Sequence, residues 1–190
     1  SATVLARADL SPTCFRLELV TAAPIAAVPG QFGMLSCDGG FDPLLRRAFS
    51  LAGVANHGDS TRVEVLIKEV GRGTARLRRI AEGSVLRLLA PLGNGFTLTA
   101  EPGQRLALVA GGIGLPPVLF AAERLAQHGT SFDLFFGAAT AAELIELERC
   151  AAAAKMVGGE VVLVTDDGSR GETGFVTAAL ARRLDHGSNY

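Results

Sequence analysis

The residues with the clearest chemical potential in this 190-residue chain are the glycines of the run V-A-G-G-I-G-L-P-P at positions 109–117. The run follows an apolar stretch, residues 105–110, and leads into a helical pattern. A buried strand that ends in glycines and opens onto a helix exposes backbone N–H groups that can bind a phosphate or pyrophosphate. Taken alone the run is ambiguous, because glycines at strand-to-helix turns also serve close packing.

A second chemical feature is an arginine in the run R-R-A-F-S at positions 46–50. The guanidinium of Arg47 is planar, keeps its charge at any working pH and presents a fork of donors that suits a phosphate. The neighbouring Phe49 and Ser50 allow two interpretations. They could face a bound ligand, or they could be a core aromatic and an ordinary strand hydroxyl.

Composition excludes several function classes. The net charge of −1 offers no general attraction to nucleic acid or to an anionic membrane, and no apolar run approaches the ~20 residues that span a bilayer. Cys14, Cys37 and Cys150 are odd in number and far apart, so they form neither a metal-ligand spacing nor a disulfide framework. We therefore expect a globular protein of a reducing, cytoplasmic compartment.

The first hundred residues are typical of short strands separated by turns. Six strands at this spacing favour a small antiparallel barrel, with one short helix at residues 74–80. The turn-rich residues 100–103 predict a boundary, so the expected domains are residues 1–100 and 101–190. The expected strands cover residues 3–10, 13–20, 31–37, 46–51, 62–68 and 84–89.

Beyond the boundary, strands alternate with helices. This alternation predicts a parallel sheet with crossover helices, so the expected fold class is a β-barrel followed by an α/β domain. We expect Glu143, Glu146 and Glu148 on the solvent face of a helix. The expected strands are 106–110, 132–136 and 161–165, and the expected helices are 116–128, 141–154 and 174–184.

The end of the third of these strands carries a polar group, T-D-D-G at positions 165–168. Ligands of parallel α/β sheets bind at the carboxyl ends of the strands, so these residues should share a crevice with the glycine run. The alternative is a simple tight turn, because Asp-Gly is a common turn pair.

Several strings of this chain, in the right order, resemble those of a known family. P-G-Q-F at 29–32, R-R-A-F-S at 46–50 and V-G-R-G-T at 70–74 resemble the flavin-binding signatures of the ferredoxin–NADP reductase superfamily. The resemblance is closer to the electron-transfer subunit of two-subunit dihydroorotate dehydrogenases, and it covers nearly the whole chain. The strings that carry it are P-L-G-N-G-F at 91–96, the glycine run, T-D-D-G-S at 165–169 and G-E-T-G-F-V-T at 171–177.

The resemblance implies FAD in residues 1–100 and NAD in residues 101–190. Arg47 would contact the FAD pyrophosphate, Phe49 would lie against the flavin, and Ser50, the expected catalytic residue, would reach the flavin edge. Gly73 and Thr74 would offer N–H groups to the pyrophosphate, although Thr74 could simply cap the helix, and Lys68 could be a solvated strand end. The expected cofactor-binding set is Arg47, Ala48, Phe49, Ser50, Ile67, Lys68, Gly73, Thr74, Gly111, Gly112, Ile113, Gly114, Pro116, Thr165, Asp166, Asp167 and Gly168, with no metal ligand.

The same resemblance implies a further segment beyond Tyr190. In the family, four cysteines of that segment hold a two-iron two-sulfur cluster, and the three cysteines present here lack the spacing to do so. Three parallel strands would also leave a narrow sheet with an uncovered edge. We therefore expect the chain to be a fragment, with the cluster only in the part that follows.

The expected function is an electron-transfer subunit of pyrimidine biosynthesis, which links NAD through FAD to a catalytic flavoprotein of the dihydroorotate dehydrogenase type in a hetero-oligomer. Neither nucleic acid nor a membrane is an expected partner. NADH is expected rather than NADPH, because residues 137–140 contain no basic side chain for a 2′-phosphate and Asp166 and Asp167 would repel it, although Arg170 could reduce this repulsion. Two alternatives stay open: the same module in another complex, such as a hydrogenase or a ferredoxin-linked oxidoreductase, and a nucleotide-binding assembly module without turnover.

Overall fold

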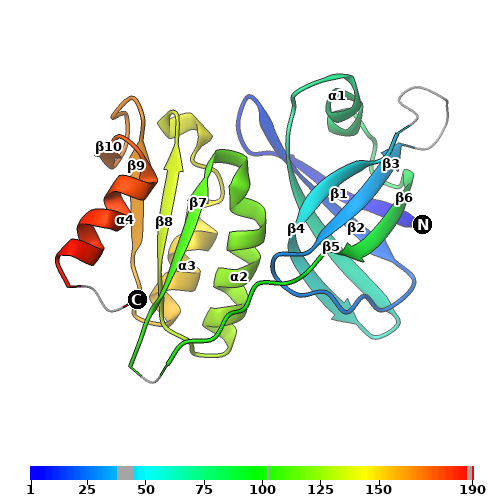
Figure 1. The fold of residues 1–190 in the computed structure, drawn as a ribbon. Helices are drawn as coiled ribbons and strands as arrows, with labels where there is room; N and C mark the ends of the chain where they lie inside the picture. The colour runs from blue at the N-terminus through cyan, green and yellow to red at the C-terminus, as the bar shows by residue number, and fades with distance from the viewer. Residues whose placement is uncertain (38–44, 102, 188–189) are drawn as a thin grey trace. The chain divides into compact units, whose positions relative to one another are not determined.

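The chain folds into two compact units, Ser1–Phe96 and Thr97–Tyr190 (Figure 1). The computed structural model describes residues 1–37, 45–101, 103–187 and 190. The division between the units falls just before the turn-rich residues 100–103, of which residue 102 lies outside the described residues.

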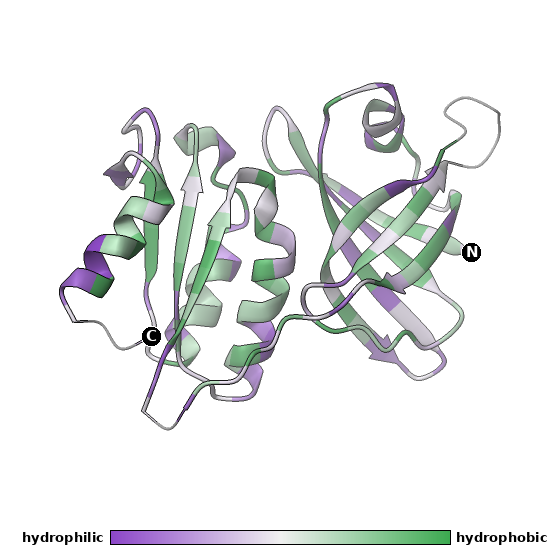
Figure 2. Cartoon of the chain, viewed as in Figure 1, coloured by the Kyte–Doolittle hydropathy of each residue, from purple (hydrophilic) through white to green (hydrophobic). Residues whose placement is uncertain are grey.

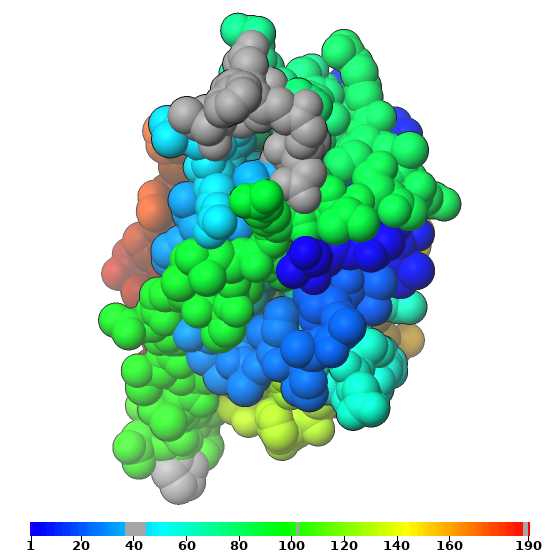
Figure 3. Space-filling model, turned by 90° about the vertical axis from the view of Figure 1, so that its right-hand side faces the viewer, coloured from blue at the N-terminus to red at the C-terminus, as the bar shows by residue number. Residues whose placement is uncertain are grey.

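The first unit is a closed, antiparallel, six-stranded barrel with the strand order β1-β2-β5-β4-β3-β6. The barrel closes where β1 pairs with β6, and Figure 3 shows the first residues, in dark blue, beside the green residues of β6. The predicted antiparallel barrel is confirmed. Its strands are β1 (Ala2–Asp9), β2 (Cys14–Thr21), β3 (Phe32–Cys37), β4 (Arg47–His57), β5 (Ser60–Lys68) and β6 (Val85–Leu92).

The fourth strand is longer than the sequence predicted. We expected it to end at residue 51 and the residues around 56–59 to form a loop, but β4 continues to His57 and turns directly into β5. Gly58 adopts a φ of 59°, which glycine reaches at little cost, so the reversal needs few residues. Polar, exposed residues at the outer end of a long hairpin therefore resembled a loop.

Alternation of side chains fills the barrel. On β2 the side chains of Phe15, Leu17 and Leu19 are fully buried, and on the neighbouring β5 Val63 and Ile67 are too. Side chains two residues apart on a strand point to the same face, so these positions form one inner layer. The intervening residues of β2, such as Arg16 and Glu18, are more exposed and pair with each other at 3.4 Å.

Two of the sequence strings fasten to each other at one end of this barrel. The side-chain amide of Gln31 donates to the carbonyl of Gly93 at 2.9 Å and accepts from the N–H of Val28 at 3.0 Å. The N–H of Phe96 donates to the Pro29 carbonyl at 2.8 Å. The strings at 29–32 and 91–96 are therefore one structural feature, which fixes the start of β3 beside the end of β6.

The short helix α1 (Arg72–Arg78) begins two residues before the predicted start at 74. Arg78 holds it to the barrel. Its Nε donates to Asp9 at 3.1 Å, and its Nη1 donates to the Pro12 carbonyl at 2.7 Å and to Glu69 at 3.3 Å. This anchoring fixes the last turn of α1 to the end of β1 and to the residue that follows β5.

The second unit is a parallel sheet with the strand order β10-β9-β8-β7 and helices on both faces (Figure 1). Figure 2 shows mainly apolar strands, whereas the last part of α4 is hydrophilic. The sheet has one strand more than predicted, the two-residue β10. The elements are β7 (Leu106–Gly111), η1 (Gly112–Gly114), α2 (Leu115–Gln127), β8 (Phe132–Ala138), η2 (Ala141–Glu143), α3 (Leu147–Met156), β9 (Val161–Thr165), β10 (Glu172–Thr173) and α4 (Val176–Asp185).

The predicted helix 141–154 is wrong in its first half. A 3₁₀ turn covers Ala141–Glu143, the chain then leaves helical geometry, and Glu146 adopts a left-handed φ of 55° before α3 begins at Leu147. The side chain of Glu146 is only 6% exposed and lies 3.7 Å from Arg149, so the expected solvent-facing position is also wrong. Leu144 and Ile145 are buried at the break, which gains apolar burial that a continuous helix would forgo.

Among the described residues, no helix is both long enough and apolar enough to cross a membrane.

Candidate functional site

A cavity of about 550 Å³ lies in the first unit between β4 and the start of α1. The strings R-R-A-F-S and V-G-R-G-T, which we expected to bind the FAD pyrophosphate, both contribute to this cavity, although they are more than twenty residues apart in the sequence. The lining residues are Arg47, Ala48 and Phe49 from β4, and Val70, Gly71, Arg72, Gly73 and Thr74 from the loop and helix that follow β5.

Arg47 is the half-buried cation of this cavity. Its Nη1 donates to the carbonyl of Leu45 at 2.8 Å, and within residues 1–37, 45–101, 103–187 and 190 no carboxylate pairs with it. A guanidinium has five donors, so most of its hydrogen-bonding capacity remains. A fixed cation at the wall of a cavity, without a counter-charge from the chain, suits an anionic ligand.

Gly73 lies directly against that guanidinium. A β-carbon built on Gly73 would lie 2.5 Å from Nη2 of Arg47 and nearer still to Nε and Cζ. The backbone of α1 and the side chain of β4 are therefore in close contact at this one point, and Gly73 is buried.

Thr74 is engaged in holding the first turn of α1. Its hydroxyl accepts from the N–H groups of Val70 at 2.9 Å and Gly71 at 3.1 Å, and it donates to the Gly71 carbonyl at 2.9 Å. The capping alternative raised from the sequence therefore describes the Thr74 side chain. A ligand in the cavity could reach its backbone N–H rather than its hydroxyl.

Three other expected residues do not line the cavity. Ser50 lies one residue beyond Phe49 on β4 and pairs with Phe32 of β3, and it is partly exposed. Ile67 is fully buried in the barrel, so only its backbone could contact a ligand. Lys68, the last residue of β5, interacts within the chain and pairs in register with Cys14.

Val70, Gly71 and Arg72 also line the cavity, but from the sequence we placed them only in the flavin-type string and assigned a ligand contact to Gly73 and Thr74 alone. Val70 is 79% exposed, which is unusual for an apolar side chain beside a cavity and offers a surface for an apolar ligand group. The signal was available, because the string V-G-R-G-T contains all three residues. From the sequence we used only Gly73 and Thr74, the residues of this string that we expected to begin the helix.

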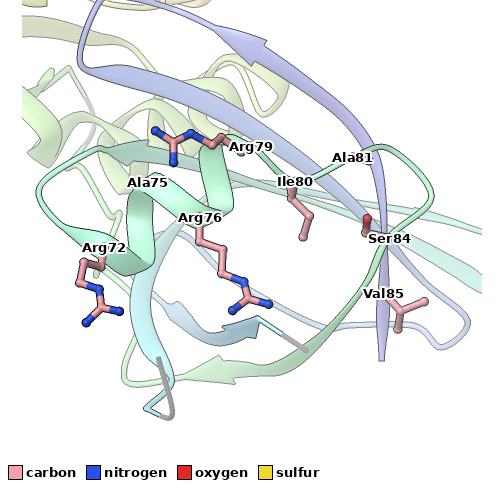
Figure 4. Close-up of a pocket in the computed structure, with 8 residues that line it drawn as sticks. All are labelled: Arg72, Ala75, Arg76, Arg79, Ile80, Ala81, Ser84 and Val85. Atoms are coloured by element: carbon pink, nitrogen blue, oxygen red, sulfur yellow. The ribbon is translucent and has the colours of Figure 1, made fainter. Parts of the chain in front are cut away.

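A second cavity, of about 590 Å³, lies along α1 and the chain that leads into β6 (Figure 4). Arg72 lines both cavities, and Figure 4 shows Arg72 and Arg76 on one side of α1 and Arg79 on the other. Because Arg72 and Arg76 already interact within the chain, this cavity gives no separate indication of a ligand.

In the second unit, the glycine run forms the turn from β7 into α2. Gly111 ends β7, Gly112–Gly114 form the 3₁₀ turn η1, and Leu115 begins α2 with a proline in its first turn. Gly112 has a φ of 49°, which favours glycine. Ile113 is 38% exposed, whereas Pro116 is buried, so Pro116 supports the helix start rather than offering a contact surface.

Open space surrounds these glycines. A β-carbon on Gly111, Gly112 or Gly114 would meet no atom within 4 Å. By contrast, a β-carbon on Gly137, at the end of β8, would lie 2.8 Å from Cβ of Val176. Close packing therefore explains Gly137 but does not explain the glycines of the run at 111–114.

The loop after β9 meets the same edge of the sheet. Gly111 pairs in register with Gly137, and Ala138 pairs with Thr165, so the three strands end side by side. Thr165 is fully buried, and its hydroxyl donates to the Arg170 carbonyl at 2.9 Å, so its side chain serves the loop and not a ligand. Asp166 and Gly168 are exposed at this edge.

Asp167 holds the loop in shape. Its Oδ1 accepts from the hydroxyl of Ser169 at 2.6 Å and from the N–H of Ser169 at 2.9 Å. These hydrogen bonds lower the pKa of the Asp167 carboxyl below its usual value of 3.8. The Ser169 hydroxyl also accepts from the N–H of Ala141 at 2.8 Å, which ties the loop to the segment after β8.

The two cysteines whose side chains the structure describes offer no reactive group to either site. Cys14 and Cys150 are free and buried, and burial raises the pKa of the Cys150 thiol to about 12. Within the described part of the chain, no group of three or more His, Cys, Asp and Glu residues could hold a metal ion.

Comparison with curated proteins finds dihydroorotate dehydrogenase B electron transfer subunits among the relatives. The chain is 39% identical over 157 residues to the dihydroorotate dehydrogenase B (NAD(+)) electron transfer subunit of Bacillus caldolyticus, covering 82% of the chain and 58% of the relative. It is 36% identical over 186 residues to the subunit of the same name from Desulforamulus reducens, covering 97% of the chain and 68% of the relative. The chain thus spans little more than half of the first relative. No family model matches it.

Comparison with solved structures gives reductases and an FAD/NAD-binding domain. The chain resembles Amycolatopsis cytochrome P450 reductase GcoB at a TM-score of 0.80 and 30% identity, over 97% of the chain and 57% of that protein. It resembles the ferredoxin reductase of carbazole 1,9a-dioxygenase at a TM-score of 0.79 and 26% identity, over 96% of the chain and 56% of that protein. The FAD/NAD-binding domain of a nitric oxide dioxygenase from Vibrio cholerae shares the fold at a TM-score of 0.75 and 18% identity, over 99% of the chain and 93% of that protein.

Proposed function

Because the chain belongs to the family of dihydroorotate dehydrogenase B electron transfer subunits, we propose that it carries electrons between a catalytic partner subunit and NAD by way of FAD. FAD binds in the cavity beside Arg47, and NAD binds at the glycine turn after β7. The observation that supports this proposal most strongly concerns Arg47. Its half-buried guanidinium faces the cavity and has no carboxylate partner among the described residues.

The cavity residues suit a flavin dinucleotide. Arg47 supplies charge-assisted donors for the pyrophosphate, and the aromatic Phe49 and the exposed Val70 supply apolar surface for a ring. When bound, FAD supplies the capacity to exchange two electrons as hydride with a nicotinamide and to exchange single electrons with other centres. The chain itself binds and orients the cofactor. Ser50, at the edge of this set, is the residue we propose to contact the flavin near its reactive nitrogen.

The second unit suits the nicotinamide dinucleotide. Gly111 and Gly114 leave space beside the backbone that no side chain of their own unit needs, which allows close approach of a pyrophosphate. The exposed Asp166 lies at the same edge of the sheet and disfavours the extra phosphate of NADPH. Asp167 and Thr165 contribute by holding the loop that carries Asp166.

The partner is a catalytic flavoprotein that oxidises dihydroorotate. We propose that a two-iron two-sulfur cluster, held by four cysteines in a part of the protein outside this chain, connects the two flavins in a hetero-oligomer of the cytoplasm. The printed name of the relatives supports the catalytic partner, and the greater length of both relatives described above is compatible with a further segment that holds the cluster.

The test uses the full-length protein purified with the products of neighbouring genes. We expect a flavin absorbance spectrum that NADH bleaches, and reduction of NAD by the complex when dihydroorotate is supplied. A complex that is inactive with dihydroorotate but active with another donor would assign the module to a different oxidoreductase. The 30% identity to a cytochrome P450 reductase favours that class as the second candidate. A protein without bound flavin would contradict both.

A further inference from the structure

Gly73 has a feature that its expected role as an N–H donor does not explain. Its own backbone does not require glycine, because its φ lies outside the left-handed region. A side chain from another element fills the space that a side chain of Gly73 would need. The guanidinium of Arg47 on β4 lies where a β-carbon of Gly73 would be.

The guanidinium is fixed from two sides. The carbonyl of Leu45 accepts from Nη1 at 2.8 Å, and the buried first turn of α1 at Gly73 lies against Nε and Nη2. Thr74 holds that first turn through hydrogen bonds from the preceding loop, and Arg78, at the other end of the short helix, holds α1 to the barrel. The position of the Arg47 charge therefore depends on the bare backbone of one residue in α1.

We propose that Gly73 is a positioning residue for Arg47: the absence of a side chain at position 73 lets the guanidinium lie against α1, aimed at the phosphates of the bound flavin dinucleotide. This inference rests on the proposed function, because it needs FAD to be the ligand of the cavity. A methyl group at position 73 would push against the far end of a flexible side chain, not against backbone. The fold should tolerate the change, while Arg47 moves away from its place.

The experiment is a double-mutant cycle on FAD affinity in the full-length protein, with the variants Gly73→Ala, Arg47→Ala and both together. We expect Gly73→Ala to weaken FAD binding about as much as Arg47→Ala, roughly tenfold, and the double variant to be no weaker than Arg47→Ala alone. Gly53→Ala is the matched control, because Gly53 lies on the same strand and its β-carbon would meet only Glu64 at an ordinary 3.8 Å. That control should bind FAD like the wild type.

Two further measurements, of thermal stability and of riboflavin affinity, distinguish the possible outcomes. The melting temperature of the FAD-free protein should not fall in Gly73→Ala, and the affinity for riboflavin, which lacks phosphates, should fall far less than the affinity for FAD. Independent effects that multiply to about a hundredfold in the double variant would overturn the proposal, since Gly73 would then act on the ligand directly. A wild-type protein that binds no FAD would instead contradict the proposed function.

Discussion

In the first unit, the candidate flavin site contains a half-buried charged side chain, Arg47, which contacts the surrounding chain closely. In the second unit, the candidate dinucleotide site consists of backbone at Gly111, Gly112 and Gly114, with open space above it. Glycines occur at both sites for opposite reasons. Gly73 makes room for a side chain of the same protein, whereas Gly111 and Gly114 leave room that no atom of the protein fills.

That contrast teaches which substitutions test a ligand and which test the fold. Where a β-carbon would meet protein, as at Gly137, a substitution reports on packing. Where a β-carbon would meet nothing, a loss of activity reports on the ligand. The predictions below use this difference, and they begin with the largest expected effect.

The first prediction concerns the open glycines. Gly111 has φ −125° and ψ 121°, an extended conformation that valine adopts readily. Gly111→Val should fold normally and keep its FAD. It should lose about a hundredfold in the catalytic efficiency of flavin reduction by NADH, equivalent to about 2.7 kcal/mol, because the side chain occupies the approach of the dinucleotide. Stopped-flow reduction with NADH measures the effect.

The control for this prediction is Gly137→Ala, at the neighbouring strand end. Its β-carbon would lie 2.8 Å from Cβ of Val176, so we expect a loss of stability of about 1–3 kcal/mol, seen as a lower melting temperature. If Gly111→Val instead lowers the melting temperature and leaves NADH reduction intact, the comparison between open and packed glycines is wrong.

The second prediction concerns the charge in the first unit. Arg47→Ala should weaken FAD retention about tenfold or more, since a hydrogen bond to a charged group contributes about 1.5–3 kcal/mol. The barrel should remain folded, because Arg47 has no ion pair among the described residues that would be broken. Arg124→Ala, which removes a cation over Phe120 in the second unit, is the control and should keep FAD. Unchanged FAD affinity in a folded Arg47→Ala variant would rule out the role.

The sequence predicted the barrel and the parallel sheet because their signals are local, and the two phosphate-type sites stay predictions that rest on equally local signals. Alternating apolar residues on β2 and β5, and a glycine run between a strand and a helix, follow from short-range geometry. The break at Glu146 was not predictable in this way. It depends on Leu144 and Ile145 finding a buried position, which is a tertiary effect that overrides a helical pattern.

The same limit applies to the candidate sites. Sequence spacing indicated Arg47 and Gly73 separately, but only the fold shows that they touch. The fold also distinguishes Asp166 from Asp167, which look equivalent in the string T-D-D-G-S. The carboxylate of Asp167 accepts hydrogen bonds from Ser169, whereas the carboxylate of Asp166 has no partner among the described residues. Which of two adjacent carboxylates remains available depends on the turn that the chain makes.

The third prediction uses that division. We expect NADH to exceed NADPH by about tenfold or more in catalytic efficiency, a difference of about 1.4 kcal/mol. The reason is that Asp166 repels a 2′-phosphate at an edge without a nearby basic residue at 137–140. Asp166→Asn should narrow the preference. Steady-state reduction of the bound flavin by each cofactor measures it, and comparable efficiency with NADPH in the wild type would contradict the assignment.

The last prediction concerns the loop and has the smallest effect at neutral pH. The hydrogen bonds from Ser169 lower the pKa of the Asp167 carboxyl in the folded protein, so the stabilisation is present above the usual value of 3.8 and is lost as the pH falls through the lower, folded pKa. Ser169→Ala removes the side-chain donor and should raise the pKa of Asp167 towards 3.8, which a carboxyl-detected NMR titration records. The variant also frees the N–H of Ala141 from the Ser169 hydroxyl, so amide exchange at Ala141 should become faster. An unchanged titration of Asp167 would mean that Ser169 does not hold the carboxylate. The distinction between the engaged Asp167 and the available Asp166 would then fail as well.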